Sequence, residues 1–137
     1  MLIKNPKIHL EIAIDYEVEG GLVLEASEVK SLRASSPSLK PTYCYINKGE
    51  VFVRHLNLSK AKNSERDKKI LLHRKQINKI MGYFSSKNYI IVPIELYEKK
   101  GLFKILIGIG IRLKKHDKRE AIKNKEMKNE IKQSIGF

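Results

Sequence analysis

The sequence has few of the residues that form disulfides and metal sites. Its 137 residues include one cysteine, Cys44, and four histidines that lie far apart along the chain. A single cysteine excludes a disulfide within the chain and is typical of a reducing compartment. The cysteine and the histidines do not follow a metal-ligand spacing such as C-x-x-C or H-x3-H. We therefore expect no metal and no other cofactor.

Long hydrophobic runs are missing as well. The longest apolar stretch, residues 102–113, is interrupted by Lys104 and Arg112 and is too short to cross a bilayer. The first residues contain Pro6 and several charges where a signal peptide requires an apolar run. These features predict a soluble, cytoplasmic protein.

No arrangement of residues in the sequence indicates a catalytic centre. Cys44 lies among tyrosines in a predicted strand, where a buried and unreactive thiol is expected. Glu25 and Glu28 are close carboxylates beside a predicted helix, but a solvated strand face and a helix cap explain them better than an acid–base pair. The GIG at residues 108–110 lies inside a strand rather than before a helix, so it does not form a phosphate-binding loop. We predict that the protein is not an enzyme.

Negative charge is scarce relative to positive charge. The chain has 28 Lys and Arg against 15 Asp and Glu, which leaves a formal net charge of +13. Such an excess repels itself in the folded state unless a polyanion offsets it. A nucleic acid is favoured over a membrane surface, because the sequence has no lipidation motif and no long basic amphipathic anchor ahead of its C-terminal segment. A merely solvated basic surface is the alternative.

Alternation of apolar and polar residues predicts a mainly β protein. The predicted strands cover residues 8–16, 22–24, 43–46, 51–56, 89–97 and 102–111. The predicted helices cover residues 28–34 and 70–82, with Ser27 as the N-cap of the first and Gly82 at the end of the second. Residues 59–69 are polar without an apolar period and are expected to form an exposed, flexible loop. Turns that contain glycine are expected at residues 19–21, 47–49 and 99–101.

The predicted strands suggest closure of the sheet. In the last strand, Phe103 and every second residue up to Ile111 share an apolar face, while Gly108 and Gly110 lie on the opposite face, where they permit a bend or a close backbone approach. About six strands with few helices cannot bury both faces of an open sheet, whereas a small barrel can. We predict an OB-like small β-barrel of about six antiparallel strands with two helices, residues 1–111, followed by a basic C-terminal tail, residues 112–137.

Aromatic residues lie on the predicted strands, and basic residues lie in the segments between them. The aromatic residues are Tyr43, Tyr45, Phe52, Tyr89, Tyr97 and Phe103. In OB-type barrels such side chains stack on bases, and burial in the core is the alternative for each of them. The lysines and arginines of residues 59–69 and of the turn at 99–101 suit contacts with phosphates.

Three segments of the chain resemble the SsrA-binding protein (SmpB) family, whose members are the protein partners of transfer-messenger RNA in bacterial ribosome rescue. The segments are EGGLVLEASEVKSLRAS (19–35), KKILLHRKQINKIMG (68–82) and KKHDKREAIKNKE (114–126). They are similar, in the same order, to the family patterns E-A-G-x-x-L-x-G-x-E-V-K-S-L-R, R-K-L-L-L-x-x-x-E-I and H-D-K-R. The likeness extends from Asn5 to about Lys125, although only Asn5 of the family's opening N-K-x-A-x-H is retained.

The resemblance implies an OB-like barrel that binds the elbow of the tRNA-like part of transfer-messenger RNA and accompanies this RNA to stalled ribosomes. The RNA-binding residues that it implies are Asn5, Glu19, Glu28, Lys30, Arg33, Leu71 and His73. A carboxylate can accept hydrogen bonds from base amines or 2′-hydroxyls, and lysine and arginine can hold phosphates. An exposed Leu71 can pack on a base, whereas the sequence alone favours a place in a helix core.

The resemblance also implies a tail that is unfolded in the free protein and becomes helical in the empty mRNA channel of the ribosome, past the decoding centre. The implied tail contacts are Lys114, Lys115, His116, Asp117, Lys118 and Arg119. Residues 112–132 carry nine basic and four acidic side chains, a net charge of +5. Met127, Ile131 and Ile135 form an apolar stripe that is too narrow to support an isolated helix. A solubilising charged tail is the alternative.

The expected partners are therefore transfer-messenger RNA and the ribosome, with alanyl-tRNA synthetase and elongation factor Tu acting indirectly through the RNA. No membrane partner is expected, and the protein is expected to be a monomer. Two other functions stay open on the sequence alone. One is a generic OB-fold protein that binds single-stranded nucleic acid, and the other is a small RNA-modifying or hydrolytic enzyme.

Overall fold

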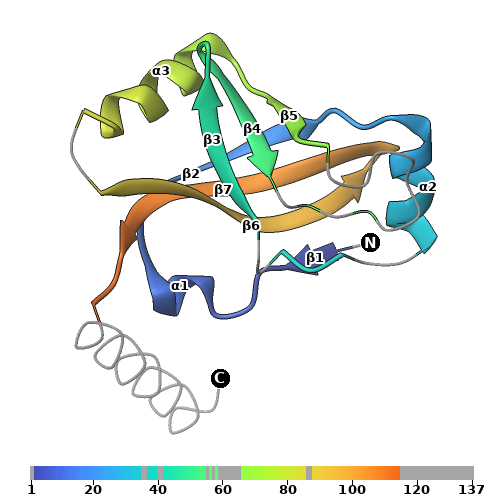
Figure 1. Cartoon of the computed structure of the whole chain (residues 1–137), viewed down its shortest axis with the longest axis horizontal. Helices are drawn as coiled ribbons and strands as arrows, with labels where there is room; N and C mark the ends of the chain where they lie inside the picture. Colours follow the sequence, from blue (N-terminus) through green and yellow to red (C-terminus); the bar gives the residue numbers. More distant parts are fainter. Residues whose placement is uncertain are drawn as a thin grey trace, which may run out of the picture.

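The chain is mainly β in the computed structural model, which describes residues 2–34, 37–39, 42–54, 56, 58, 66–85 and 88–114 (Figure 1). The elements in chain order are β1 (Leu2–Lys4), α1 (Ile8–Glu11), β2 (Ile12–Leu22), α2 (Ala26–Ala34), β3 (Tyr43–Asn47), β4 (Glu50–Arg54), β5 (Lys68–Leu71), α3 (Arg74–Tyr83), β6 (Tyr89–Lys99) and β7 (Leu102–Arg112). No helix among the described residues has the length and apolar character needed to cross a bilayer.

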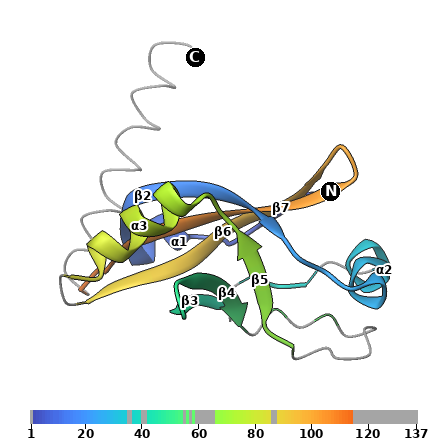
Figure 2. The same cartoon turned by 90° about the horizontal axis from the view of Figure 1, so that it is seen from above.

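Six of the seven strands close into a barrel. The hydrogen-bonded order is β6–β3–β4–β5–β2–β7, and β7 pairs again with β6. Every pair is antiparallel, and β1 adds to β6 outside this ring. Figure 2 shows β3 and β4 below the long strands β2, β6 and β7. The predicted barrel of about six antiparallel strands is therefore confirmed. The ring is uneven, because β3 and β6 share a single paired position, Cys44 opposite Ile91.

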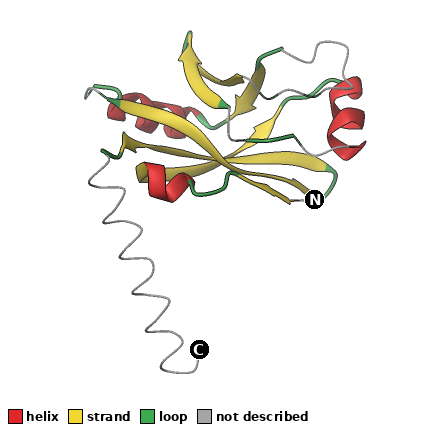
Figure 3. Cartoon of the chain, turned by 60° about the horizontal axis from the view of Figure 1, so that its bottom comes forward, coloured by secondary structure: helices red, strands yellow, loops and turns green. Residues whose placement is uncertain are grey.

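The barrel interior is filled by alternate residues of the strands. Ile105, Ile107 and Ile109 of β7 are fully buried, as their shared apolar face predicted, whereas Ile111 at the end of that face is exposed. Leu32 of α2 and Ile80 of α3 are fully buried in the same cluster. Each such aliphatic side chain contributes roughly 1.5–3 kcal/mol when it is removed from water. The two helices lie at opposite ends of the barrel (Figure 3).

A second, smaller apolar cluster lies on the outer face of the long strands. It consists of Ile8, Ile12, Val92 and Ile94, with Ile14, Ile90 and Leu106 packed against it. The glycines of β7 make this packing possible, since a Cβ on Gly108 would lie 2.9 Å from Ile94 Cδ1 and a Cβ on Gly110 would overlap the carbonyl of Ala13. The predicted close backbone approach is therefore confirmed at Gly110, whereas Gly108 makes room for the side chains of Ile94 and Ile14.

The first predicted strand and the turn after it were wrong in detail. Residues 8–11 form helix α1, so β2 begins at Ile12 rather than at residue 8. The strand then runs through Gly20 and Gly21 to Leu22 without turning. Gly20 serves packing instead, because a Cβ there would lie 2.5 Å from Ile70 Cγ2 and 2.8 Å from Leu72 Cδ2. A glycine required for close packing between strands was mistaken for a turn glycine.

The helix boundaries differ for related reasons. Residues 68–71 form strand β5, so α3 begins at Arg74 and the predicted loop ends before Lys68. Helix α2 begins at Ala26 rather than after Ser27, because the backbone N–H of Glu25 donates to Glu28 Oε1 at 2.8 Å. A carboxylate three residues into the helix thus satisfies an N–H ahead of it. Gly82 lies inside the last turn of α3, which ends at Tyr83.

Candidate nucleic-acid interface

A polar groove of about 420 Å³ lies where β2, β5 and the start of α3 meet. Its lining residues are Glu19, Gly20, Gly21, Leu71, Leu72, His73, Gln76 and Lys104. The antiparallel register places Gly21 opposite both Leu71 of β5 and Lys104 of β7, which draws three distant segments together. This polar groove contains three of the seven residues predicted to bind RNA, namely Glu19, Leu71 and His73.

Glu19 presents an exposed carboxylate at one side of the polar groove. It lies opposite Leu106 on β7, and the hydroxyl of Tyr97 on β6 reaches across β7 to donate a hydrogen bond to Glu19 Oε2. This bond orients the carboxylate while the side chain stays exposed. An exposed, oriented carboxylate can accept hydrogen bonds from base amines or from a 2′-hydroxyl.

Leu71 and His73 form the opposite side of the polar groove. In β5 the side chains alternate, so Lys68 and Ile70 are buried and Leu71 points outward with 55% of its surface exposed. His73 is exposed at the N-cap of α3, where its backbone N–H donates to Gln76 Oε1 at 2.9 Å. The core position that the sequence favoured for Leu71 depended on a helix at residues 70–82, and the strand removes that alternative.

Cations lie beside the polar groove. Half-buried Lys104 is one of its lining residues. Arg74 and Lys75 are exposed in the first turn of α3, and Arg74 donates to the Gly49 carbonyl at 3.1 Å. Cations beside a groove can bind the phosphates of a nucleic acid, while the groove itself can hold a base or a sugar.

Glu28 belongs to a buried charge cluster with Arg66 and Lys68, away from the polar groove. Its side chain is fully buried, Arg66 Nη2 donates to Glu28 Oε1, and Lys68 Nζ lies 3.7 Å from Glu28 Oε2. Lys68, also fully buried, donates to the Leu56 carbonyl at 2.7 Å. Glu28 therefore has no surface to offer a ligand, and any effect on binding passes through the segments that it holds together.

The buried charge cluster is held ionised by its own contacts. Burial raises the pKa of Glu28, but hydrogen bonds from Arg66 and the Glu25 N–H, and the charges of Arg66 and Lys68, bring the pKa below its ordinary value. Burial lowers the pKa of Lys68, and the negative charge of Glu28 opposes that effect. The cluster joins the start of α2 to β5 and to the segment after β4.

Asn5 is also buried, and its side chain supports the fold. Its Nδ2 donates to the Pro93 carbonyl at 2.8 Å, and its backbone N–H donates to the Ile94 carbonyl at 2.8 Å. These bonds lie where the register of β6 against β7 shifts between Pro93 and Glu95. Asn5 thus fastens the end of β1 to an irregular stretch of β6, and does not line the polar groove.

Lys30 and Arg33 are exposed on α2, at the other end of the barrel from α3. Arg33 forms an ion pair with Glu98 at 2.7 Å, and its guanidinium lies 5.8 Å from the centre of the Phe103 ring. Of the predicted tail contacts, Lys114 is exposed just after β7, and residues 115–119 lie outside the described residues. The structure therefore does not bring Lys30 or Arg33 to the polar groove.

The aromatic residues divide between core and surface. Phe103 is buried, while Tyr43 is 40% exposed on β3. Tyr45 and Phe52 stack with ring centres 5.5 Å apart, and the Arg54 guanidinium lies 4.5 Å from the centre of the Tyr45 ring. The core alternative thus holds for Phe103. The β3–β4 hairpin carries Tyr43, Tyr45 and Phe52, and Tyr89 and Tyr97 are half-buried on β6.

Sequence reasoning missed Gln76 and Lys104 as lining residues of the polar groove, and it missed Tyr97 as the residue that orients Glu19. Their positions depend on the register of three strands and on the N-terminus of α3, and only the 89–111 hairpin was readable from the sequence. Cys44 is buried, as predicted, and burial raises the pKa of its thiol. Within the described residues, no three His, Cys, Asp or Glu side chains gather as metal ligands would.

Comparison with known proteins gives a matching family model and several similar proteins. The family model described as SmpB protein matches residues 2–136. The SsrA-binding protein of Bacillus pumilus (strain SAFR-032) is 41% identical over 139 residues, which cover 96% of this chain and 89% of that protein. Those of Geobacillus sp. (strain WCH70) and Bacillus subtilis (strain 168) are 38% identical over 142 residues, which cover 98% of this chain and 92% and 91% of the two proteins.

A solved structure shares the fold. It is described as "tmRNA-SmpB: a journey to the center of the bacterial ribosome", and the matching chain has a TM-score of 0.67 and 25% sequence identity. The match covers 88% of this chain and 94% of that chain. Both the sequence relatives and the solved structure thus match nearly the whole chain rather than one motif.

Proposed function

This chain belongs to the SmpB protein family, and we propose that it binds transfer-messenger RNA and delivers it to stalled ribosomes for rescue. The observation that carries the proposal is the polar groove, in which Glu19, Leu71 and His73 lie exposed on one surface. These residues come from two segments that are far apart in the sequence, and each was predicted to bind RNA. We propose the elbow of the tRNA-like part of the RNA as the ligand of this surface.

The side chains of the polar groove contact different parts of the RNA. Glu19, oriented by Tyr97, accepts hydrogen bonds from base amines or a 2′-hydroxyl, and Leu71 packs against an unstacked base or a sugar. Lys104 and the exposed cations near it hold phosphates. Because elbow loops expose unstacked bases on a folded scaffold, the surface favours a tRNA-like RNA over a duplex.

The remaining parts of the proposal concern the C-terminal tail, the oligomeric state and the cellular compartment. Residues 112–137 act as a basic tail that becomes helical in the empty mRNA channel, and the barrel of residues 1–111 carries the transfer-messenger RNA. The protein works as a monomeric adaptor in the cytoplasm and catalyses no reaction. Its effects on alanyl-tRNA synthetase and elongation factor Tu pass through the RNA.

Competition binding tests the choice of ligand. The protein should bind a folded tRNA-like RNA much more tightly than an unstructured oligonucleotide of the same length. With about five phosphates neutralised, the logarithm of affinity should fall against the logarithm of salt concentration with a slope of roughly −3 to −5. Equal affinity for both RNAs would favour a generic single-strand-binding protein.

The variant Leu71→Ala tests whether the RNA binds at the polar groove. It should weaken binding of the tRNA-like RNA by roughly 1–2.5 kcal/mol, because the three carbon groups that alanine lacks are lost at the contact. Leu102→Ala is the matched control, since Leu102 is 62% exposed at the β6–β7 turn, outside the polar groove. Equal losses in the two variants would remove the groove from the binding surface.

Truncation separates the two proposed parts. Removal of residues 113–137 should leave affinity for transfer-messenger RNA nearly unchanged and abolish rescue of stalled ribosomes in a reconstituted translation reaction. Loss of RNA binding by the truncated protein would reverse the roles assigned to barrel and tail.

A further inference from the structure

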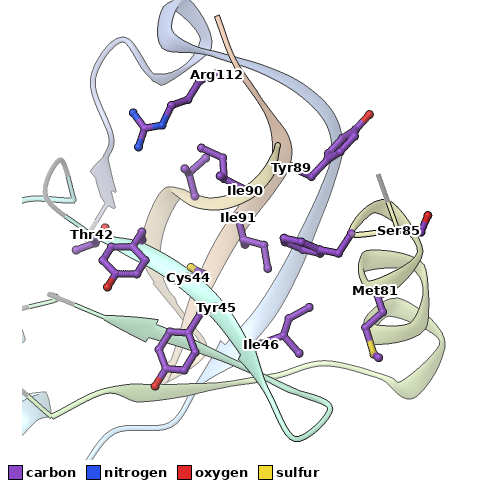
Figure 4. A pocket seen from close by; sticks show the side chains of 13 residues that line it. Thr42, Cys44, Tyr45, Ile46, Met81, Ser85, Tyr89, Ile90, Ile91 and Arg112 are labelled. Atoms are coloured by element: carbon purple, nitrogen blue, oxygen red, sulfur yellow. The ribbon is translucent and has the colours of Figure 1, made fainter. Parts of the chain in front are cut away.

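A second groove, of about 710 Å³, lies between β3, β6 and the C-terminal end of α3 (Figure 4). This apolar groove has one charged residue, Arg112, among the described residues that line it. Figure 4 shows Cys44 and Ile91 at its floor, Met81 and Ser85 on the helix side, and Arg112 at one end. The polar groove lies at the other end of α3, where the helix begins.

The apolar groove exists because the barrel is open along one seam. Within the described residues, β3 and β6 pair at a single position, Cys44 opposite Ile91, although the strands are five and eleven residues long. Tyr45 and Ile46 of β3 and Ile90 of β6 therefore line a gap instead of a continuous ladder. The gap is a fixed feature of the fold, since the strands on either side are well paired with β4 and β7.

Exposed apolar side chains are concentrated in the apolar groove. Eight large hydrophobic residues are exposed in the described part of the chain, and three of them, Tyr43, Met81 and Phe84, line this groove at 40%, 46% and 41% exposure. Such a concentration indicates a surface that another segment or molecule covers.

The lining of the apolar groove defines the chemistry of its occupant. Aliphatic and aromatic side chains form its floor and walls, so the occupant must bring several apolar groups to displace water from them. Arg112 at one end calls for an acidic group beside those apolar groups. A polypeptide segment with spaced apolar residues and a neighbouring carboxylate meets both requirements.

The tail of the chain contains such a segment after residue 126. Residues 115–126 contain one large apolar residue, whereas residues 127–137 contain four, namely Met127, Ile131, Ile135 and Phe137. The first three of these are spaced four residues apart, so they share one face of a helix. We call residues 127–137 the terminal segment. Its apolar stripe is too narrow to support an isolated helix, so a surface that covers the stripe favours order in the segment.

Position and charge favour the terminal segment as the occupant. Strand β7 ends at Arg112, which lines the apolar groove, and fourteen residues separate Arg112 from Met127. A coil of that length would span about 20 Å on average, so the attachment gives the segment a high effective concentration at the groove. Glu126 and Glu130 each precede a residue of the apolar stripe, and either carboxylate can pair with Arg112.

We propose that the terminal segment folds back in the free protein and docks in the apolar groove. Its apolar stripe packs against Met81 and Phe84, and a carboxylate beside the stripe pairs with Arg112. Docking covers two apolar surfaces at once and leaves the polar groove open, because the two grooves lie at opposite ends of α3.

Docking of the terminal segment restricts the part of the tail that is free of the barrel. The family resemblance implied that the whole tail is unfolded in the free protein, whereas docking limits this state to the residues between the barrel and the terminal segment. The segment must then leave the apolar groove before the tail enters the mRNA channel. The docking itself does not rest on the proposed function, because it takes place without RNA.

Tryptophan fluorescence of the full-length protein tests the inference. The chain contains no tryptophan, so Phe84→Trp reports on the apolar groove alone. Acrylamide should quench this tryptophan several-fold more strongly once Ile131→Asp and Ile135→Asp are added, because a carboxylate does not enter an apolar groove without a partner. Leu102→Trp, at a position exposed outside both grooves, should be quenched equally with and without the two changes.

A second pair of substitutions controls for the added charge. Asn129→Asp with Gln133→Asp places the same two charges away from the apolar stripe, and should leave quenching of Phe84→Trp unchanged. Equal quenching with the stripe pair and with this control pair would overturn the inference. Protection of the tryptophan that increases with protein concentration would also overturn it, since a second copy of the chain would then be the occupant.

Hydrogen exchange of the otherwise unchanged protein gives an independent measurement. Amides of residues 127–135 should exchange several-fold more slowly than those of residues 117–125, because docking protects them from solvent. Ile131→Asp should remove the difference. Equal exchange rates in the two stretches before any substitution would contradict docking, whether or not the protein binds transfer-messenger RNA.

Discussion

Glu19 and Glu28 lie nine residues apart in the same predicted motif and have opposite surroundings. Glu19 is exposed on β2 and shares its carboxylate with one tyrosine hydroxyl, so it remains open to a ligand. Glu28 is fully buried in the charge cluster with Arg66 and Lys68. The comparison shows that a carboxylate in a motif can serve the ligand or the fold, and that its neighbours in space decide which.

The largest expected effect comes from breaking the buried charge cluster. Lys68→Met leaves the Glu28 carboxylate buried with one cation fewer, and should lower the free energy of unfolding by about 3–5 kcal/mol. Urea denaturation measures this change. Lys69→Met is the matched control, because Lys69 is partly exposed and pairs with Glu50 at the surface, where the expected loss is below about 1 kcal/mol. Similar losses in the two variants would mean that burial of Lys68 has no energetic importance.

Substitution of Glu19, the exposed carboxylate, should weaken RNA binding and leave the free energy of unfolding unchanged. Glu19→Gln keeps an oxygen that can accept the hydrogen bond from Tyr97 but removes the negative charge. It should weaken the complex with the tRNA-like RNA by about 1.5–3 kcal/mol, the usual range for a hydrogen bond to a charged group. Titration of labelled RNA measures the change in affinity, and an unfolding curve for the same variant measures the change in stability. A stability loss with intact binding would give Glu19 the role that we assign to Glu28.

The pH dependence of stability sharpens the same contrast. The pKa of Glu28 is lowered in the folded protein, so the unfolded chain binds its proton first as the pH falls below the ordinary value of 4.5. The free energy of unfolding should therefore decrease as acid protonates the unfolded chain, and this contribution is fully present only above that value. Glu28→Gln should flatten the acid limb of the stability curve.

The smallest effect is expected for the exposed ion pair at the other end of the barrel. Arg33 and Glu98 lie 2.7 Å apart with much of both side chains in solvent, 55% and 25%. Glu98→Gln should change the free energy of unfolding by less than about 1 kcal/mol. Urea denaturation measures this change. A larger loss would mean that the ion pair of Arg33 stabilises the fold as the buried charges do.

The hairpin of β6 and β7 was predictable because its signals are local. Alternating apolar residues, a turn with Gly101 and glycines on one face of β7 require no knowledge of the rest of the chain. Strand β5 was missed because four residues followed by a helix start do not show a clear period. The closed barrel was predicted by counting strands, and its ring order came only with the structure.

The predicted site could be read only in part, for a reason that particular residues make clear. The motifs pointed to Glu19, Leu71 and His73, and the structure gathers them at one groove. They also pointed to Asn5 and Glu28, whose side chains are buried and bonded within the protein. Motif similarity marks residues that matter to a family, and it does not separate those that touch a ligand from those that hold the binding surface in place.

Composition and pattern were enough to establish a basic, mainly β chain, because charge and alternation are properties of the chain itself. The tertiary structure decided which carboxylate is buried, where the barrel stays open and which cations face each groove. These features arise when strand pairing brings together residues far apart in the sequence, and the free energy of a charge depends on those neighbours and on its distance from water.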